Sequence, residues 1–120
     1  MRKGVEITFQ AQGGHALVEA LANVAGERMS REIDIDWRIF HVQYGNEDFY
    51  RVLYTGKKVG LLHPLEDKRV REIFDETAHM ERQELMKTFE IMRRKGFKPR
   101  TVVEVKEELD LWQDRLWDYI

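Results

Sequence analysis

The stretch that decides the fold covers residues 65–99 and reads LEDKRVREIFDETAHMERQELMKTFEIMRRKGFKP. At about 100° per residue, its apolar side chains form one stripe and most of its charged side chains face away. The stripe comprises Val70, Ile73, Phe74, Ala78, Leu85, Phe89, Ile91 and Met92. The pattern predicts one long amphipathic helix, residues 65–95, that packs one face against the rest of the chain.

Both ends of this helix carry signals. The basic run at residues 93–95 suits the negative end of a helix dipole, Gly96 permits a left-handed cap, and Pro99 prevents continuation. At the other end, Pro64 closes a preceding strand, and Asp67 is the expected N-cap.

The middle of the stripe contains polar side chains. Thr77, Glu81, Glu84 and Thr88 project onto its centre, where a buried and unpaired carboxylate would cost several kcal/mol. Three alternatives remain open: the helix breaks near residues 80–84, its middle is exposed, or Glu81 has a partner.

Length and composition bound the fold and the function. The 120 residues predict a single α+β domain, with a sheet part at about 1–64 and a helical part at about 65–120. A net charge of −2 gives no global argument for nucleic acid or membrane binding. The absence of cysteine excludes thiolate metal sites and fits a cytoplasmic protein. Since no run approaches about 18 apolar residues, we expect no membrane span.

The order of elements before residue 65 predicts an α+β fold. The expected strands cover residues 5–10, 33–44, 49–54 and 59–63, and the first helix covers residues 15–29, with Gly26 weakening its last turn. The first strand is expected to join beside the second through a right-handed crossover. The whole order is β-α-β-β-β-α-α, with a mostly antiparallel four-stranded sheet packed by helices.

Turn positions suggest how the hairpin strands pair. If Tyr44 pairs with Phe49 and Tyr54 pairs with Val59, then His41, Tyr50 and His63 share one face near the same end of the sheet. Two imidazoles and a phenol could form a small polar pocket suited to acid–base chemistry. The alternative is that His41 packs in the core and His63 only ends a strand.

The spacing of the histidines places two of them near carboxylates that could share a metal ion. His15 and Glu19 are four residues apart, and Glu76 and His79 are three apart, so each pair shares a helix face. A carboxylate-bridged di-iron site needs two Glu-x-x-His pairs plus two further glutamates, and only one such pair is present. We therefore expect no metal and no cofactor.

A basic cluster follows the long helix and surrounds Phe97. Its members are Arg93, Arg94, Lys95, Lys98 and Arg100. Basic side chains beside an aromatic ring are typical of single-strand nucleic-acid binding, and these five are the candidate phosphate contacts. Helix C-termini also favour cations in any protein.

The C-terminal residues 101–120 are expected to form a last helix, with Thr101 and Glu104 as its capping box. Its apolar seam is a candidate protein interface and includes Val105, Leu109, Trp112, Leu116, Trp117 and Tyr119. Folded back on the long helix as a helical hairpin, it would bring Arg115 towards Glu81 or Glu84, unless the long helix breaks.

These patterns favour a small, cytoplasmic, non-enzymatic binding or regulatory protein. It would act through its C-terminal helices, as a homodimer or with a partner protein. The alternatives are a nucleic-acid-associated protein that uses the basic cluster, and a small enzyme that uses the histidine and tyrosine pocket. No membrane partner is expected.

Overall fold

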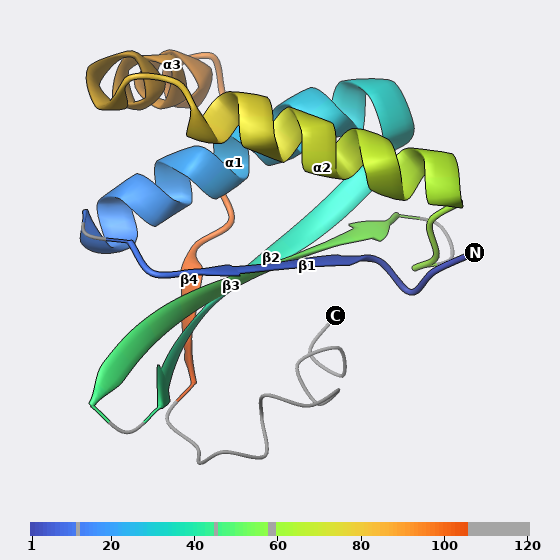
Figure 1. Cartoon of the computed structure of the whole chain (residues 1–120). Helices are drawn as coiled ribbons and strands as arrows, with labels where there is room; N and C mark the ends of the chain where they lie inside the picture. The colour runs from blue at the N-terminus through green and yellow to red at the C-terminus, as the bar shows by residue number, and fades with distance from the viewer. Residues whose placement is uncertain (12, 45, 58–59, 106–120) are drawn as a thin grey trace.

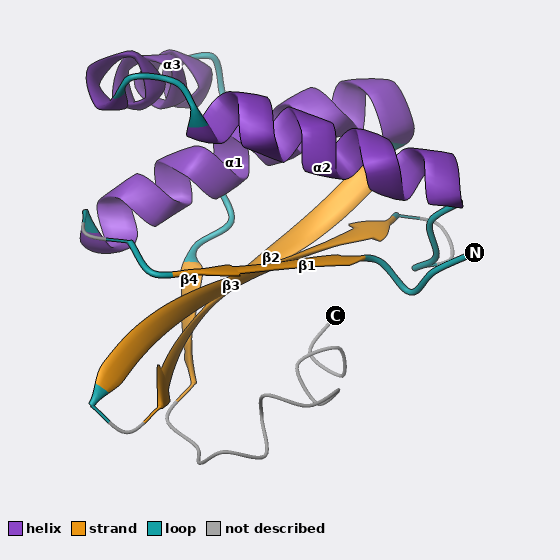
Figure 2. Cartoon of the chain, in the orientation of Figure 1, coloured by secondary structure: helices purple, strands orange, loops and turns teal. Residues whose placement is uncertain are grey.

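The structure is a computed structural model of the chain, and it describes residues 1–11, 13–44, 46–57 and 60–105. In chain order the elements are β1 (Val5–Phe9), α1 (Gly14–Ile33), β2 (Ile35–Tyr44), β3 (Glu47–Gly56), α2 (Pro64–Ala78), α3 (Arg82–Arg94) and β4 (Val102–Val105). All three helices lie on one side of the four-stranded sheet (Figures 1 and 2). The predicted α+β fold, with a mostly antiparallel sheet packed by helices, is confirmed.

The strands lie in the order β1-β3-β2-β4. Strand β3 is antiparallel to both β1 and β2, and β4 is parallel to β2. The expected position of the first strand beside the second is therefore wrong. Because β3 folds back from the hairpin and occupies that place, β1, α1 and β2 form a split β-α-β unit.

The hairpin is tighter than expected. Tyr44 pairs with Glu47 instead of Phe49, a shift of two positions. Alternate residues of a strand share a face, so a shift of two leaves every side chain on its predicted side. The shift does change neighbours, because His41 now lies opposite Tyr50.

The fourth strand comes from a different part of the chain than predicted. Residues 60–63 form no strand, and Leu62 makes only an isolated bridge to Arg2. Instead, Val102–Val105, expected to begin the last helix, pairs with β2. Three valines in four residues favour a strand, and the edge of β2 offers unpaired backbone groups. The rest of the predicted last helix, residues 106–120, lies outside the described part of the chain.

The long helix breaks where its stripe is polar. Helix α2 ends before residues 79–81, and α3 begins after Glu81, whose extended backbone (φ −62°, ψ 142°) serves as the N-cap. Glu81 and Glu84 are both exposed. The alternative of a break near residues 80–84 is confirmed, while Arg115 lies outside the described residues.

Thr77 is the one polar side chain of that stretch that is fully buried. Its hydroxyl donates to the backbone oxygen of Ile73 at 2.7 Å and accepts a hydrogen bond from Arg28 at 3.0 Å. Arg28 also pairs with Glu76 at 2.8 Å. The polar centre of the stripe therefore joins α2 to α1 without burying a carboxylate.

The N-cap of α2 is His63 and not Asp67. The backbone N–H of Leu65 donates to the Nδ1 of His63 at 3.2 Å, and the backbone N–H of His63 donates to the Glu66 carboxylate at 3.0 Å. This is a capping box followed by Pro64 in the first turn. Asp67 lies inside the helix and pairs with Arg71.

A buried asparagine joins the helical layer to the sheet. The Nδ2 of Asn23, on α1, donates to the backbone oxygens of Glu19 at 2.8 Å and Arg100 at 2.9 Å. Its Oδ1 accepts from the backbone N–H of Arg100 at 2.8 Å and the indole N–H of Trp37 at 3.3 Å. Both hydrogen-bonding groups of the side chain are used, and they connect α1, β2 and the segment that leads into β4.

Trp37 is packed from several sides. Phe97 stacks on its ring at 6.3 Å between centroids, and the Arg100 guanidinium lies 3.9 Å from the ring centre. A Cβ at Gly26 would lie 2.4 Å from the same ring. Gly26 was expected to weaken the last turn of its helix, but it lies well inside α1 and makes room for the indole.

Replacing Asn23 with leucine should test this arrangement. The change keeps the size of the side chain but removes its hydrogen bonds to Trp37 and Arg100. Groups left without partners cost about 1–3 kcal/mol each, so we expect a loss of about 3 kcal/mol or more in the free energy of unfolding, measured by urea denaturation. Ser30→Ala, on an exposed part of the same helix, should change it by less than about 0.5 kcal/mol. A loss below about 1 kcal/mol for Asn23→Leu would contradict this role.

Candidate functional site

Ionisable side chains from four elements meet where α1 begins. We call this group the histidine cluster. It comprises His15 in the first turn of α1, His41 on β2, Asp48 and Tyr50 on β3, and Glu104 on β4. His41 is central because it pairs in register with Tyr50 on one side and with Glu104 on the other.

The carboxylate of Glu104 bridges the two imidazoles. One oxygen lies 2.5 Å from the Nε2 of His15, and the other lies 2.6 Å from the Nδ1 of His41. The remaining ring nitrogens also have partners: Tyr50 Oη is 2.7 Å from His15 Nδ1, and Asp48 Oδ1 is 3.2 Å from His41 Nε2. All four imidazole nitrogens are thus oriented by a neighbouring polar atom.

Ring packing holds the cluster in shape. His41 stacks on Tyr50 at 4.8 Å with an interplanar angle of 21°, and the His15 ring meets both edge-on. The His41 side chain is 13 % exposed, whereas those of His15 and Glu104 are 45 % and 48 % exposed. The cluster therefore has a fixed inner side and an outer side that a small ligand or ion can reach.

The charges of the cluster shift two pKa values in opposite directions. The hydrogen bond from His15 lowers the pKa of Glu104 below its ordinary value of 4.5, and His41 acts in the same direction against the effect of burial. Burial raises the pKa of Tyr50, and the charges of Glu104 and Asp48 add to the rise. At neutral pH the cluster therefore contains a charged carboxylate beside a neutral phenol.

The structure brings together two of the three residues predicted to line a polar pocket. His41 and Tyr50 are in contact, but His63 is not in the cluster, since it caps α2 instead of ending a strand. Sequence reasoning missed His15, Asp48 and Glu104 as members. His15 lies in the first turn of α1, and no local signal in the sequence pairs it with Glu104, which is 89 positions away.

Glu19, Glu76 and His79, which belong to the two helix-face pairs, have hydrogen-bond or ion-pair partners in the structure. The Glu19 carboxylate accepts a hydrogen bond from the backbone N–H of Val102 at 3.4 Å, and Glu76 pairs with Arg28. His79 bonds the backbone oxygen of Asp75 at 2.7 Å. The one group of three possible metal-ligating residues found in the described part of the chain is His15, His41 and Glu104.

The basic cluster is partly engaged in contacts of its own. Arg93 lies over the ring of Phe89 at 5.6 Å, Arg94 pairs with Glu90 at 3.4 Å, and the Arg100 guanidinium stacks on Trp37. The two lysines of the cluster are exposed. Fewer cations are therefore available for phosphate groups than the sequence implies.

The predicted protein interface lies mostly outside the described residues, as Leu109, Trp112, Leu116, Trp117 and Tyr119 all do. Its first member, Val105, is 7 % exposed. It packs in a small apolar cluster with Phe40, Val42 and Leu53.

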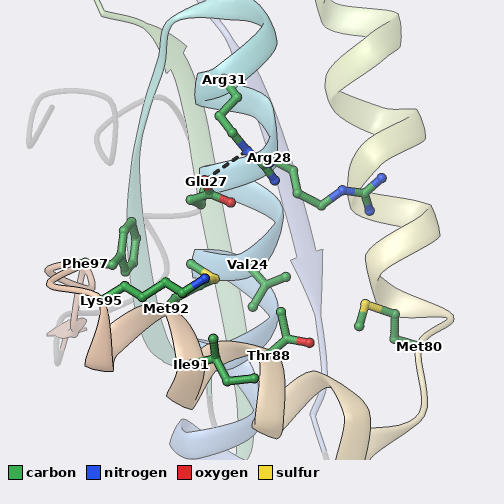
Figure 3. Close-up of a pocket in the computed structure, with 10 residues that line it drawn as sticks. All are labelled: Val24, Glu27, Arg28, Arg31, Met80, Thr88, Ile91, Met92, Lys95 and Phe97. Carbon is green, nitrogen blue, oxygen red and sulfur yellow. Dashed lines mark ion pairs between the residues drawn. The ribbon is translucent and has the colours of Figure 1, made fainter.

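A groove of about 570 Å³ lies between α1 and α3, towards the C-terminal half of α1 (Figure 3). Its walls are apolar and its edges carry cations. It is lined by Val24, Glu27, Arg28, Arg31, Met80, Thr88, Ile91, Met92, Lys95 and Phe97. Within the described residues, no helix is long and apolar enough to cross a membrane.

Because the pKa of Glu104 is lowered in the folded protein, we expect the free energy of unfolding to depend on this residue at acid pH. As pH falls, the unfolded carboxyl takes up its proton before the folded one, so stability present above about pH 4.5 is lost below it. We expect Glu104→Gln to lose less unfolding free energy than the unmodified protein between about pH 6 and pH 3, measured by denaturant titration. Glu81→Gln, at an exposed glutamate, controls for the loss of one carboxylate. Equal losses in the unmodified protein and Glu104→Gln would contradict the pairing.

Comparison with known proteins identifies a family. A search of curated proteins found no match to the chain. One protein family, described as "Protein of unknown function (DUF2004)", matches residues 1–120. The chain therefore belongs to the DUF2004 family.

Proposed function

We propose that this protein is a non-enzymatic binding protein that recognises an acidic amphipathic helix of a partner protein. The helix would lie in the groove between α1 and α3. The observation that carries the proposal is an open apolar groove whose edges are basic. A regulatory or adaptor role in the cytoplasm is part of the same proposal.

The walls of the groove have the chemistry of a helix receptor. Ile91 is 41 % exposed although its side chain is large and apolar. Met80 and Met92 line the same space, and flexible thioethers adapt to different apolar partners. Grooves of this kind accept the apolar face of an amphipathic helix. Figure 3 places Ile91 and Thr88 of α3 across the space from Val24 of α1.

The charges at the edges select for acidic flanks on that helix. Three cations and one acid line the groove. Arg31 pairs with Glu27 at 2.9 Å, and Arg28 pairs with Glu76 at 2.8 Å. Lys95 has no ion pair among the described residues and is exposed. An excess of positive charge speeds encounter with acidic partners and disfavours basic ones.

The chain itself contains a segment of suitable composition. Residues 106–120 include five acidic and two basic side chains together with two tryptophans and three leucines. Self-association through these residues, the predicted interface, is therefore one form of the proposal. A separate partner protein with a helix of the same chemistry is the form to which we commit.

A designed peptide tests the groove directly. The probe is a fluorescent helix with Leu and Trp on one face and Glu on its flanks, titrated into the full chain and followed by anisotropy. Ile91→Glu places a carboxylate in the apolar wall, so we expect the affinity to fall at least about 10-fold. Leu65→Glu makes the same kind of change at an exposed residue outside the groove, and should leave the affinity unchanged.

Three outcomes decide the proposal. A peptide with Lys in place of Glu should bind more weakly than the acidic one, and equal binding by both would contradict the role of the basic edges. Equal affinities for Ile91→Glu and Leu65→Glu would place the binding elsewhere. Preferential binding of single-stranded DNA, with an affinity that falls steeply with salt, would favour the nucleic-acid function instead.

Sedimentation of the full chain then separates the two forms of the proposal. A monomer at high micromolar concentration that still binds the peptide supports a separate partner. A dimer that is disrupted by Ile91→Glu and not by Leu65→Glu would identify a second copy as the occupant.

A further inference from the structure

We propose that His15, His41 and Glu104 form a binding site for a divalent transition-metal ion such as Zn²⁺. One ligand atom from each of the three residues lies within 4.8 Å of the others. The site lies near the first turn of α1, whereas the groove is lined by residues 24–31 of the same helix, so the two sites are independent.

The donor set suits zinc. Imidazole nitrogens and carboxylate oxygens bind Zn²⁺ at about 2.0–2.2 Å, so donors in a tetrahedral site lie about 3.4 Å apart. Glu104 now lies 2.5 and 2.6 Å from the two imidazoles, and must move outward by about 0.8 Å to admit the ion. The side chains of His15 and Glu104 are about half exposed and have room to make this movement.

The atoms around the cluster provide the support that metal-binding histidines require. A ligating imidazole usually donates its other N–H to an oxygen, which fixes its orientation and tautomer. With the ion on His15 Nε2, the Nδ1–H donates to Tyr50 Oη. With the ion on His41 Nδ1, the Nε2–H donates to Asp48. Both supporting contacts, at 2.7 and 3.2 Å, already exist without the ion.

Metal binding changes the tautomer of the histidines at this site. In the metal-free protein, the contacts between Glu104 and the two histidines are hydrogen bonds that need a hydrogen on His15 Nε2 and on His41 Nδ1. The ion occupies those positions, and each neutral imidazole then carries its hydrogen on the other ring nitrogen. The carboxylates of Glu104 and Asp48 together match the two positive charges of the ion. Three protein ligands leave a fourth position for water on the exposed side.

The placement of the ligands makes the site rigid on its inner side. His41 lies on β2, between two neighbouring strands, and is mostly buried. Glu104 is fixed opposite it by the parallel pairing of β4. Only His15 comes from a helix, and its ring packs against both His41 and Tyr50. A preformed arrangement of this kind reduces the entropy lost on binding.

The test is a zinc titration of the full chain near neutral pH, by calorimetry and by competition with a chromophoric chelator. We expect one ion per chain, with at least about a 100-fold loss of affinity for His15→Ala and for His41→Ala. Tyr50→Phe keeps all three ligands but removes the supporting oxygen, so we expect about a 10-fold loss. The matched control is His79→Ala, at an exposed histidine on the end of α2, which should bind like the unmodified protein.

A second readout guards against variants that fold poorly. Zinc should raise the melting temperature of the unmodified protein and of His79→Ala, and should leave that of His15→Ala unchanged. His15→Gln, a conservative change at an exposed position, should behave like His15→Ala. The proposal is overturned if zinc binds no more tightly than about millimolar, or if the His15 and His41 variants bind it as tightly as His79→Ala.

Discussion

Three of the four hydrogen bonds of the buried Asn23 side chain reach beyond α1, two to the backbone of Arg100 and one to the indole of Trp37, and they hold the segment before β4 against α1 and β2. The backbone of Arg100 makes two of them, accepting one at its carbonyl oxygen and donating one from its N–H, and its guanidinium stacks on Trp37. Because the strand begins two residues later, at Val102, these contacts determine where β4 meets β2. The position of Glu104 opposite His41, and hence the histidine cluster, depends on this buried amide.

Patterns with a local period could be predicted from the sequence. The apolar stripe of residues 65–95 predicted one long helix, and its polar centre pointed to a break near residues 80–84 as one of three alternatives, because carboxylates cannot lie unpaired in a core. The strand β4 could not be predicted in this way. Thr101 and Glu104 form a capping-box pattern and the valines fit a helical seam, but pairing with β2 overrides these local preferences.

The candidate site was likewise predictable only where it depends on local patterns. His41 and Tyr50 were correctly placed on one face, because an error of two residues in register preserves faces. His63 was wrongly included, since its strand does not form. Glu104 was missed as a site residue because it is 63 positions from His41 and 89 from His15. Contacts between residues so distant in sequence depend on the tertiary fold, and periodicity carries no information about them.

If the Asn23 contacts fix the strand that carries Glu104, the backbone amide of Arg100 must be protected, because that N–H donates to Asn23 at 2.8 Å. Hydrogen exchange followed by NMR measures this protection. We expect slow exchange, comparable to amides in the middle of β2, since opening this bond would require detaching β4. Exchange of the Arg100 amide at the rate of an unprotected peptide would show that Asn23 does not hold β4 in place.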